Sequence, residues 1–403
     1  MFNSNTPFNN TPFGTPFNSP FGGPIQQIHQ TPKSQPQNVE GTPRFLNYAA
    51  DFGGCAFWRM LWPESLLNTH DNCIVHTSTV MHKDPRFFSH FRAIKFQRQA
   101  APHQREFIKF TKQLSEQFNI RLIYEIDDIP FREDIPEYNK HKPSFSSDEI
   151  RQSVQEIMEI CGNMSVTCDF MKDYFQSKLD NSVKIDVIPN YIPKFWIGNF
   201  YNQDQIQSNY ERNKRKPRIC WSGSGAHFDV DRRVKGKDDF YHINDVVRKT
   251  VNDFRWVFYG GISHELVDLV RSGKVEFHPW VRLYDYPEKL HSLNVNMFIA
   301  PLIDNNFNKS KSDLKYLEAS VLGIPIACQD LCTYKNAPIK FQTGNEMIDR
   351  IKQTIKDERQ YIKQSVQARK YAETRFLERE ENFNKFYDNY MYDKGDSRRK
   401  YLK

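Results

Sequence analysis

Short apolar runs of strand length alternate with stretches of helical periodicity, and this alternation constrains the fold more than any other feature of the sequence. In the first half, residues 71–77, 120–128, 163–167 and 183–189 have the pattern of strands, and residues 103–118 and 147–161 that of helices. The alternation restarts later, with strand candidates at 218–223, 254–261, 274–281, 295–302 and 324–329. Strands separated by helices predict parallel sheets covered by helices. The sequence therefore predicts an α/β protein with two Rossmann-like domains.

Changes in composition mark the domain boundaries. Thr/Ser-Pro-Phe recurs in the first 44 residues, where frequent proline prevents regular structure. We assign 1–44 to a disordered tail, 45–199 and 218–375 to the N- and C-terminal domains, 200–217 to a linker, and 376–403 to a C-terminal helix and basic tail. The tail is either neutral or uses its Phe residues to bind a protein partner. Two such domains usually bind a ligand in a central cleft.

Composition narrows the class of protein. The formal net charge of +7 permits a polyanionic partner such as DNA without requiring one. No apolar run reaches about 18 residues and the N-terminus lacks a signal-peptide pattern, so no membrane insertion is expected. Seven scattered cysteines, including Cys328 and Cys332 without ligands at metal-site spacing, indicate reduced thiols and no metal site. We expect a cytoplasmic protein, in the host cytoplasm if a phage encodes it.

One helix candidate, within residues 310–326, carries unusual charges. Ser310 and Asp313 form a weak capping box that predicts a helix start near Lys311, and Gly323 predicts its end. Glu318 falls on the apolar stripe of this helix and therefore needs partners. It is either a core carboxylate satisfied by backbone amides or an acceptor for sugar hydroxyls.

Two lysines, Lys311 and Lys315, lie near the predicted start of this helix. A cation there opposes the helix dipole by about 0.3–1 kcal/mol. That cost disappears if an anion such as a phosphate binds at the helix N-terminus.

Residues 305–334, NNFNKSKSDLKYLEASVLGIPIACQDLCTY, resemble the donor-site signature of retaining GT-B glycosyltransferases of the glycogen-synthase-like group, in a form familiar from phage and bacterial members. In that group a helix carries two glutamates eight residues apart, followed by Gly-x-Pro. Glu318 matches the second glutamate, which in the family holds the nucleotide ribose. Ser310 stands where the first would be. The resemblance implies the GT-B fold, with two Rossmann-like domains facing a central cleft, over residues 45–390.

The resemblance also implies a donor site built from several segments. The loop in residues 218–231 looks like the family's Gly-rich loop, whose amides approach a diphosphate, and residues 277–281 match its base-contacting segment. Basic residues after the loop either reach the phosphates or are simply solvated. The predicted donor-binding residues are Gly223, Ser224, Gly225, His227, Arg232, Lys235, Trp280, Val281, Ser310, Lys311, Lys315 and Glu318.

Adjacent carboxylates, Asp127 and Asp128, follow a predicted strand. They could bind Mg²⁺ or Mn²⁺ as in GT-A transferases, but two βαβ halves favour an acceptor-side or structural role, including that of a base at the acceptor hydroxyl. We predict Asp127, Asp128 and Lys311 as catalytic residues. Lysines and helix amides would stabilise the leaving diphosphate without a metal or other cofactor.

The expected activity is transfer of a sugar from a nucleoside-diphosphate sugar, with UDP-sugar as the expected donor. The positive charge and the basic, aromatic residues 90–105 suggest a hydroxymethylated pyrimidine in phage DNA as acceptor. Residues 90–105 are equally compatible with a solvated helix, and a saccharide, lipid or protein acceptor stays open. A non-catalytic binding protein with the same fold is the alternative of another class.

Overall fold

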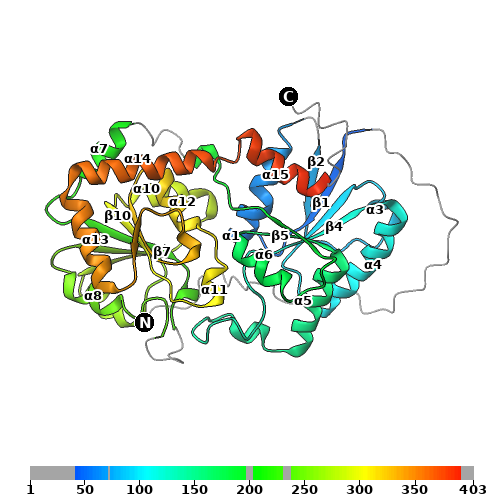
Figure 1. Ribbon diagram of the computed structural model, residues 1–403, viewed down its shortest axis with the longest axis horizontal. Coiled ribbons are helices and arrows are strands. Elements are labelled where there is room, and N and C mark those ends of the chain that lie inside the picture. The colour runs from blue at the N-terminus through cyan, green and yellow to red at the C-terminus, as the bar shows by residue number, and fades with distance from the viewer. Residues whose placement is uncertain (1–40, 71–72, 197–202, 230–236, 392–403) are drawn as a thin grey trace. The chain divides into compact units, whose positions relative to one another are not determined.

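The computed structural model describes residues 41–70, 73–196, 203–229 and 237–391 (Figure 1). Its contacts divide the chain into two compact units. Unit 1 takes its described residues from Met1–Asp127, Phe145–Ile188 and Phe383–Lys403, and unit 2 takes them from Asp128–Ser144 and Pro189–Asn382. Residues 1–40, most of the predicted tail, lie outside the described part of the chain.

Unit 1 contains a six-stranded parallel sheet in the order β2-β1-β3-β4-β5-β6. Its strands are β1 (Arg44–Tyr48), β2 (Ile74–Ser78), β3 (Ala93–Gln97), β4 (Arg121–Glu125), β5 (Asn163–Val166) and β6 (Lys184–Val187). Its helices include α1 (Gly54–Ala56), the π-helical turn Phe57–Leu61, α2 (Trp62–Leu67), α3 (Pro85–Phe88), α4 (Pro102–Phe118), α5 (Asp148–Cys161) and α6 (Asp169–Gln176). Four of these strands confirm predictions from the sequence.

Strand β3 corrects the interpretation of residues 90–105. All five of its residues are buried, as expected for a strand covered on both faces. Lys95 is 1% exposed, and its ammonium lies 4.0 Å from the centre of the Tyr390 ring. The prediction that this stretch forms a DNA-facing surface or a solvated helix is wrong for residues 93–97. The sheet buries the lysine because an aromatic ring and the Glu125 carboxylate offset its desolvation.

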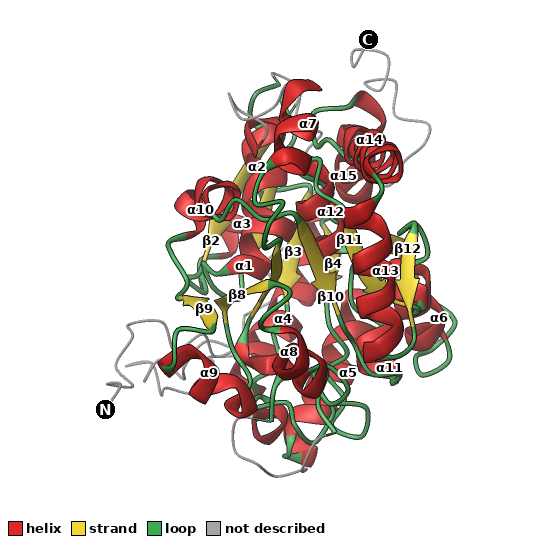
Figure 2. Cartoon of the chain, turned by 90° about the vertical axis from the view of Figure 1, so that its left-hand side faces the viewer, coloured by secondary structure: helices red, strands yellow, loops and turns green. Residues whose placement is uncertain are grey.

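Unit 2 contains a second six-stranded parallel sheet in the order β12-β11-β10-β7-β8-β9. Its strands are β7 (Arg218–Gly223), β8 (Arg255–Gly260), β9 (Val275–His278), β10 (Met297–Ala300), β11 (Ile326–Gln329) and β12 (Ile339–Phe341). Helices surround the strands in Figure 2. Trp221, Trp256 and Phe258 form the centre of the core on one face of the sheet. The chain moves outward from β7 in one direction and then restarts at β10 on its other side, so the topological switch point of this sheet lies between β7 and β10.

The helices of unit 2 are α7 (Gln203–Glu211), α8 (Asn244–Thr250), α9 (Val267–Arg271), α10 (Tyr286–Ser292), α11 (Asn306–Lys309), α12 (Leu314–Val321), α13 (Gly344–Lys356) and α14 (Glu358–Thr374). Helix α7 lies in the stretch predicted as a linker. It packs on unit 2, where Asn209 Nδ2 donates to Leu322 O at 3.3 Å and Gln207 Nε2 donates to Glu358 Oε1 at 2.9 Å. Helix α7 contains few apolar residues, so its sequence shows no apolar stripe with helical period.

Two segments belong to a unit that their position in the sequence does not indicate. Residues 128–144 pack in unit 2, where Tyr138 OH donates to Asp239 Oδ1 at 2.9 Å. Helix α15 (Glu380–Met391) contributes its residues from Phe383 onward to unit 1. There the Tyr390 ring stacks 4.5 Å from Phe45. Hydrophobic patterning identifies buried residues but not which core receives them, so neither exchange was predicted.

Within the described residues, no helix is both long enough and apolar enough to cross a bilayer.

Candidate functional site

The loop after β7 forms a tight turn at the carboxyl edge of the unit 2 sheet. Ser224 caps a 3₁₀ turn, Gly225–His227, by accepting a hydrogen bond from Ala226 N at 3.3 Å. A Cβ at Gly223 would lie 2.5 Å from the Trp221 ring and 2.7 Å from Lys315 Nζ. Packing therefore requires Gly223 to have no side chain. The sequence places this loop correctly at the end of a strand, beside the topological switch point where ligands of such sheets bind.

Helix α12 begins later than the capping-box pattern predicts. Its first residue is Leu314, and Asp313 occupies the N-cap position without a side-chain cap bond. The Asp313 carboxylate instead pairs with Arg375 Nη1 at 3.2 Å and accepts from Tyr371 OH. The predicted start near Lys311 is wrong because this long-range ion pair takes the capping carboxylate. The predicted end is confirmed, since Gly323 follows the helix with φ +64°.

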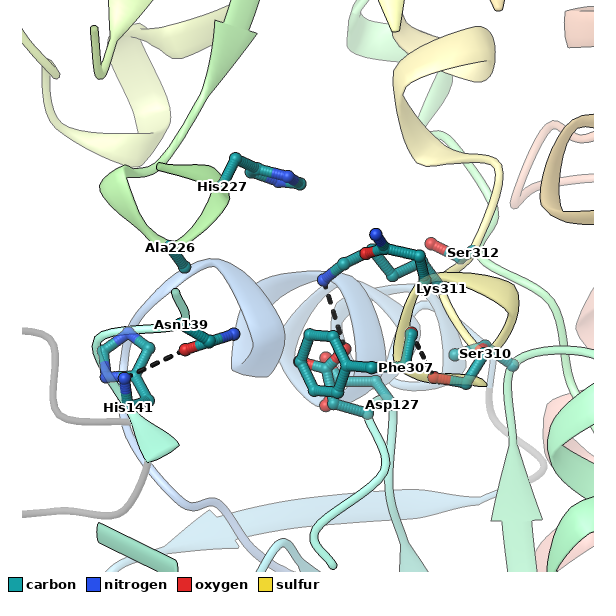
Figure 3. Close-up of polar contacts among 12 residues, drawn as sticks. Asp127, Asn139, His141, Ala226, His227, Phe307, Ser310, Lys311 and Ser312 are labelled. Carbon is teal, nitrogen blue, oxygen red and sulfur yellow. Dashed lines mark hydrogen bonds and ion pairs between the residues drawn. The ribbon is translucent and has the colours of Figure 1, made fainter. Parts of the chain in front are cut away.

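Ser310 ends the short helix α11 and does not begin α12. It is fully buried, and its hydroxyl donates to Phe307 O at 2.7 Å (Figure 3). Donor contact through this hydroxyl remains a prediction and would require the turn to rearrange.

Lys311 lies in the turn between α11 and α12. Its ammonium is 4.4 Å from the centre of the Phe307 ring and 3.6 Å from Asp128 Oδ1 (Figure 3). Asp128 belongs to unit 2 through residues 128–144, and this ion pair holds both side chains in the loop region that follows β10. A lysine held by one carboxylate on one side can still face an anion on the other.

Lys315 lies in the first turn of α12 and points to the Gly-rich loop. Its ammonium donates to Ser222 O, the residue before Gly223, and lies 5.0 Å from the centre of the Trp221 ring. Burial lowers the pKa of this lysine to about 8, against the opposing effect of Glu318. A cation is thus fixed directly beside the loop whose amides we expect to approach a diphosphate.

Glu318 follows one turn later on the same helix. It is 7% exposed, and Tyr286 OH from the start of α10 donates to its Oε2 at 3.0 Å. Burial raises the pKa of this carboxyl to about 7, although Lys315 and Tyr286 both lower it. The predicted inward position is confirmed. A side chain, not backbone amides, supplies the hydrogen bond that the buried carboxylate needs.

Tyr286, which donates to this carboxylate, belongs to a group of three aromatic rings. Trp280, 46% exposed after β9, lies 5.1 Å from Tyr259 and 5.6 Å from Tyr286 between ring centres. A Cβ at Gly260, where φ is +94°, would lie 2.5 Å from the Trp280 ring. The ring therefore rests on a glycine backbone and offers an exposed apolar face, while the neighbouring Val281 is half-buried.

His227 and Asp239 form a buried pair that sequence reasoning described incompletely. His227 Nδ1 lies 2.6 Å from Asp239 Oδ2. Asp239 Oδ1 also accepts from Tyr138 OH at 2.9 Å, Asn308 Nδ2 at 2.7 Å and Ile303 N at 3.0 Å. His227 was predicted as a donor-binding residue of the Gly-rich loop, and Asp239 was not predicted at all. Its partners lie 12 to 101 residues away, so no local pattern could have identified it.

The remaining predicted residues are Arg232, Lys235 and Asp127. Arg232 and Lys235 fall outside the described residues. Asp127 belongs to unit 1, where Arg98 Nη1 lies 3.5 Å from its Oδ1. Burial alone would raise the pKa of Asp127, but Arg98 and the Cys55 thiol outweigh it and the net pKa is lowered. Asp127 and Asp128 therefore pair with different cations, and in the described part of the chain no three metal-ligating side chains converge.

Asp127 lies at the carboxyl edge of its own sheet, after β4. The buried Glu125 in that strand receives a hydrogen bond from Arg59 Nε at 2.6 Å. Arg59 lies in the π-helical turn Phe57–Leu61 and also donates to Ile188 O at 2.6 Å. These contacts fix the end of β4 that positions Asp127.

Comparison with known proteins identifies the fold. No protein-family model matches the sequence, and no curated protein sequence matches it. Sucrose-phosphate synthase from Thermosynechococcus elongatus aligns over 87% of this chain and 98% of its own, with a TM-score of 0.58 and 13% identity. HepE from Anabaena, solved with UDP and glucose, covers 83% and 95% of the two chains, with a TM-score of 0.55 and 12% identity.

A glycosyltransferase from Rickettsia africae aligns over 89% of this chain and all of its own, with a TM-score of 0.56 and 11% identity. These likenesses and the two parallel sheets confirm the predicted fold class: the chain has the GT-B fold, with two Rossmann-like units.

Proposed function

We propose that the protein is a glycosyltransferase whose unit 2 binds a UDP-sugar donor. The observation that carries the proposal is the contact between the Lys315 ammonium and Ser222 O. It joins the start of α12 to the Gly-rich loop at the topological switch point, and it places Glu318 one turn deeper. A cation, a small-residue loop and a buried carboxylate in this order suit a diphosphate followed by a ribose.

The fold supports the same proposal. HepE, which shares it, was solved with UDP and glucose. In this chain the exposed Trp280 face and the Val281 backbone are the parts of unit 2 that we assign to the nucleotide base. Glu318 would accept hydrogen bonds from the ribose hydroxyls, with Tyr286 holding the carboxylate.

The chemistry that we assign to these residues is stabilisation of a leaving group. As the glycosidic bond breaks, negative charge develops on the diphosphate. Lys315, Lys311 and the loop amides are held in place before the reaction, so they stabilise that charge without reorganising. We propose retention of the anomeric configuration and no requirement for a metal, with Asp127 on the acceptor side. We propose that Asp128 acts as the ion-pair partner of Lys311 and not as a base at the acceptor hydroxyl.

A hydroxymethylated pyrimidine in DNA remains our proposed acceptor, now supported only by the net charge of +7. The burial of β3 removes the basic stretch that also suggested it. Any test of the acceptor must therefore include a saccharide, a lipid and a protein. We keep as proposals a cytoplasmic location and a protein partner for the N-terminal tail.

The test is a panel of UDP- and GDP-sugars, each incubated with the full chain and with hydroxymethylcytosine DNA, a saccharide, a lipid, a protein, or no acceptor. Product mass identifies donor and acceptor, NMR of the product gives its anomeric configuration, and a parallel series with EDTA tests the metal requirement. Lys315→Met should abolish turnover. The charge-matched control Lys352→Met, in a half-buried lysine of α13, should not. A folded protein that neither hydrolyses nor transfers from any donor would support the binding-protein alternative.

A further inference from the structure

We propose that Asp239 is a positioning residue that holds His227 ready to take up a proton when a donor diphosphate binds. Donor binding would then be linked to proton uptake at His227 Nε2. The inference rests on the proposed function, because it assumes that unit 2 binds a nucleoside-diphosphate sugar.

The first support is the number of hydrogen bonds to Asp239. Its two oxygens accept from His227, Tyr138, Asn308 and the Ile303 amide, and the residue is 3% exposed. Four donors fix the carboxylate in one orientation. Three of them already donate to Oδ1, and a carboxylate oxygen accepts hydrogen bonds, so we assign the proton between Oδ2 and His227 to Nδ1.

The second support is the protonation state of Nε2, the other ring nitrogen of His227. With Nδ1 protonated, a neutral imidazole has only a lone pair at Nε2 and cannot donate to a phosphate. Burial lowers the pKa of His227 to about 4 and outweighs the raising effect of Asp239, and Lys315 and Lys311 lower it slightly further. Among the described residues, Nε2 has no hydrogen-bond partner. In the empty site His227 is therefore neutral at pH 7.

The third support is the position of the ring among charges. His227 lies in the turn after β7, and the charges of Lys315 on α12 and Lys311 in the turn before it both act on the ring. Figure 3 shows Lys311 on the side toward which the His227 ring extends. Asp239 is the acidic partner, and Tyr138 reaches it from residues 128–144. Burial is the main cause of the neutral ring, the two lysines add to it, and the lysines are also the groups we expect a diphosphate to neutralise.

A bound diphosphate therefore favours the protonated form of His227 over the neutral form. One added negative charge about 4 Å away, at an effective dielectric constant near 20, favours the imidazolium by roughly a thousandfold. A proton from solvent would bind Nε2, which then donates to a phosphate oxygen while Nδ1–H still donates to Asp239. No other bond forms or breaks, and product release returns the proton to solvent.

The experiment is titration calorimetry of the full chain with UDP-glucose at pH 6.5, in two buffers of different ionisation enthalpy. UDP-glucose is preferred to UDP because its diphosphate has no terminal phosphate that titrates near pH 6. The wild type should take up about half a proton or more per ligand bound beyond His227→Gln, and its affinity relative to that variant should rise about five- to thirtyfold from pH 7.5 to pH 6. Glu318 also titrates near neutral pH, so the comparison with variants decides the origin of the proton.

His227→Gln should lose most of this uptake and the associated pH dependence. His264→Gln, in an exposed turn of the same unit, should retain both. Asp239→Asn should reduce uptake, and His227→Gln provides the test if that variant does not fold. Equal proton uptake by His227→Gln and the wild type overturns the inference while leaving the proposed function intact. Absence of saturable binding of UDP-glucose and of every other UDP- and GDP-sugar to the wild type overturns both.

Discussion

Glu318 is a buried carboxylate whose three immediate influences oppose one another. Burial favours its protonated form, whereas Lys315 and the Tyr286 hydroxyl favour its ionised form. The result is a side chain that changes charge near neutral pH. A ribose with two adjacent hydroxyls can donate to either oxygen of the ionised form, so a bound nucleoside would favour the carboxylate.

The first prediction concerns this contact. Glu318→Ala should weaken UDP binding about ten- to hundredfold, the loss expected for hydrogen bonds to a charged acceptor. Calorimetric titration with UDP measures the effect, with circular dichroism to establish folding. Tyr286→Phe, which removes the hydroxyl but keeps the ring between Tyr259 and Trp280, should have a smaller effect. Unchanged UDP affinity in a folded Glu318→Ala protein would refute the ribose role.

The second prediction concerns stability and pH. The pKa of Glu318 is about 7 in the folded protein against 4.5 in the unfolded chain, so the folded state binds more protons between these values. Its contribution to the free energy of unfolding is fully present below pH 4.5 and is lost as the pH rises through 7, by about 3 kcal/mol at most.

Glu318→Gln lacks this pH dependence. The variant should therefore become more stable relative to the wild type as the pH rises from 5 to 7.5. Urea unfolding of both proteins at the two pH values measures the difference. Glu288→Gln, an exposed change on α10, is the control for loss of a carboxylate. A stability difference between Glu318→Gln and wild type that does not change with pH would contradict the raised pKa.

At the scale of elements, local pattern identified α12 and its surroundings well, but not its beginning. The stripe of leucines around Glu318 and the glycine at the end are properties of neighbouring residues, and both predictions are confirmed. The start depends on Asp313, whose carboxylate is bound by Arg375, 62 residues later. The sequence did not predict the Asp239 contacts or the burial of β3, for the same reason. Each depends on a partner that sequence neighbours do not reveal.

The third prediction tests the element that carries Trp280. Gly260→Ala adds a Cβ 2.5 Å from the Trp280 ring at φ +94°, so the ring must move. Gly273→Ala is matched in backbone strain, with φ +70°, but its Cβ would meet no atom within 4 Å. Both variants should lose about 1–2 kcal/mol of stability from the left-handed backbone. UDP affinity should fall severalfold in Gly260→Ala alone, and equal affinities would show that Trp280 does not contact the base.

At the scale of the whole molecule, the order of residues in the chain does not match the membership of the two units. Residues 128–144 leave the first sheet after β4 and supply Tyr138 and Asp128 to unit 2. Helix α15 follows most of unit 2 in sequence and packs on unit 1 from Phe383 onward. The periodicity of the sequence predicted two α/β halves correctly because each strand and helix is locally encoded. The unit to which each of these two segments belongs depends on long-range contacts. For α15, the contacting residues are hundreds of positions apart in the sequence.

The last prediction tests that assignment through the C-terminal helix. Truncation after Arg379 removes Tyr390, which stacks 4.5 Å from Phe45, donates to Asn47 at 2.7 Å and covers Lys95 at 4.0 Å. Loss of one buried aromatic alone costs about 3–5 kcal/mol, so unit 1 should lose its cooperative unfolding transition. Truncation after Met391 keeps the helix and should behave as the full chain.

Unit 2 keeps the described α12, the Gly-rich loop and residues 128–144 in both truncations. UDP affinity should therefore persist after truncation at Arg379 while the thermal transition of unit 1 is lost, because the proposed donor contacts lie within unit 2. Differential scanning calorimetry and UDP titration on the same samples separate the two effects. An intact unit 1 transition in the shorter protein would mean that α15 adds little to this core. Loss of UDP binding would mean that the donor site depends on residues beyond unit 2.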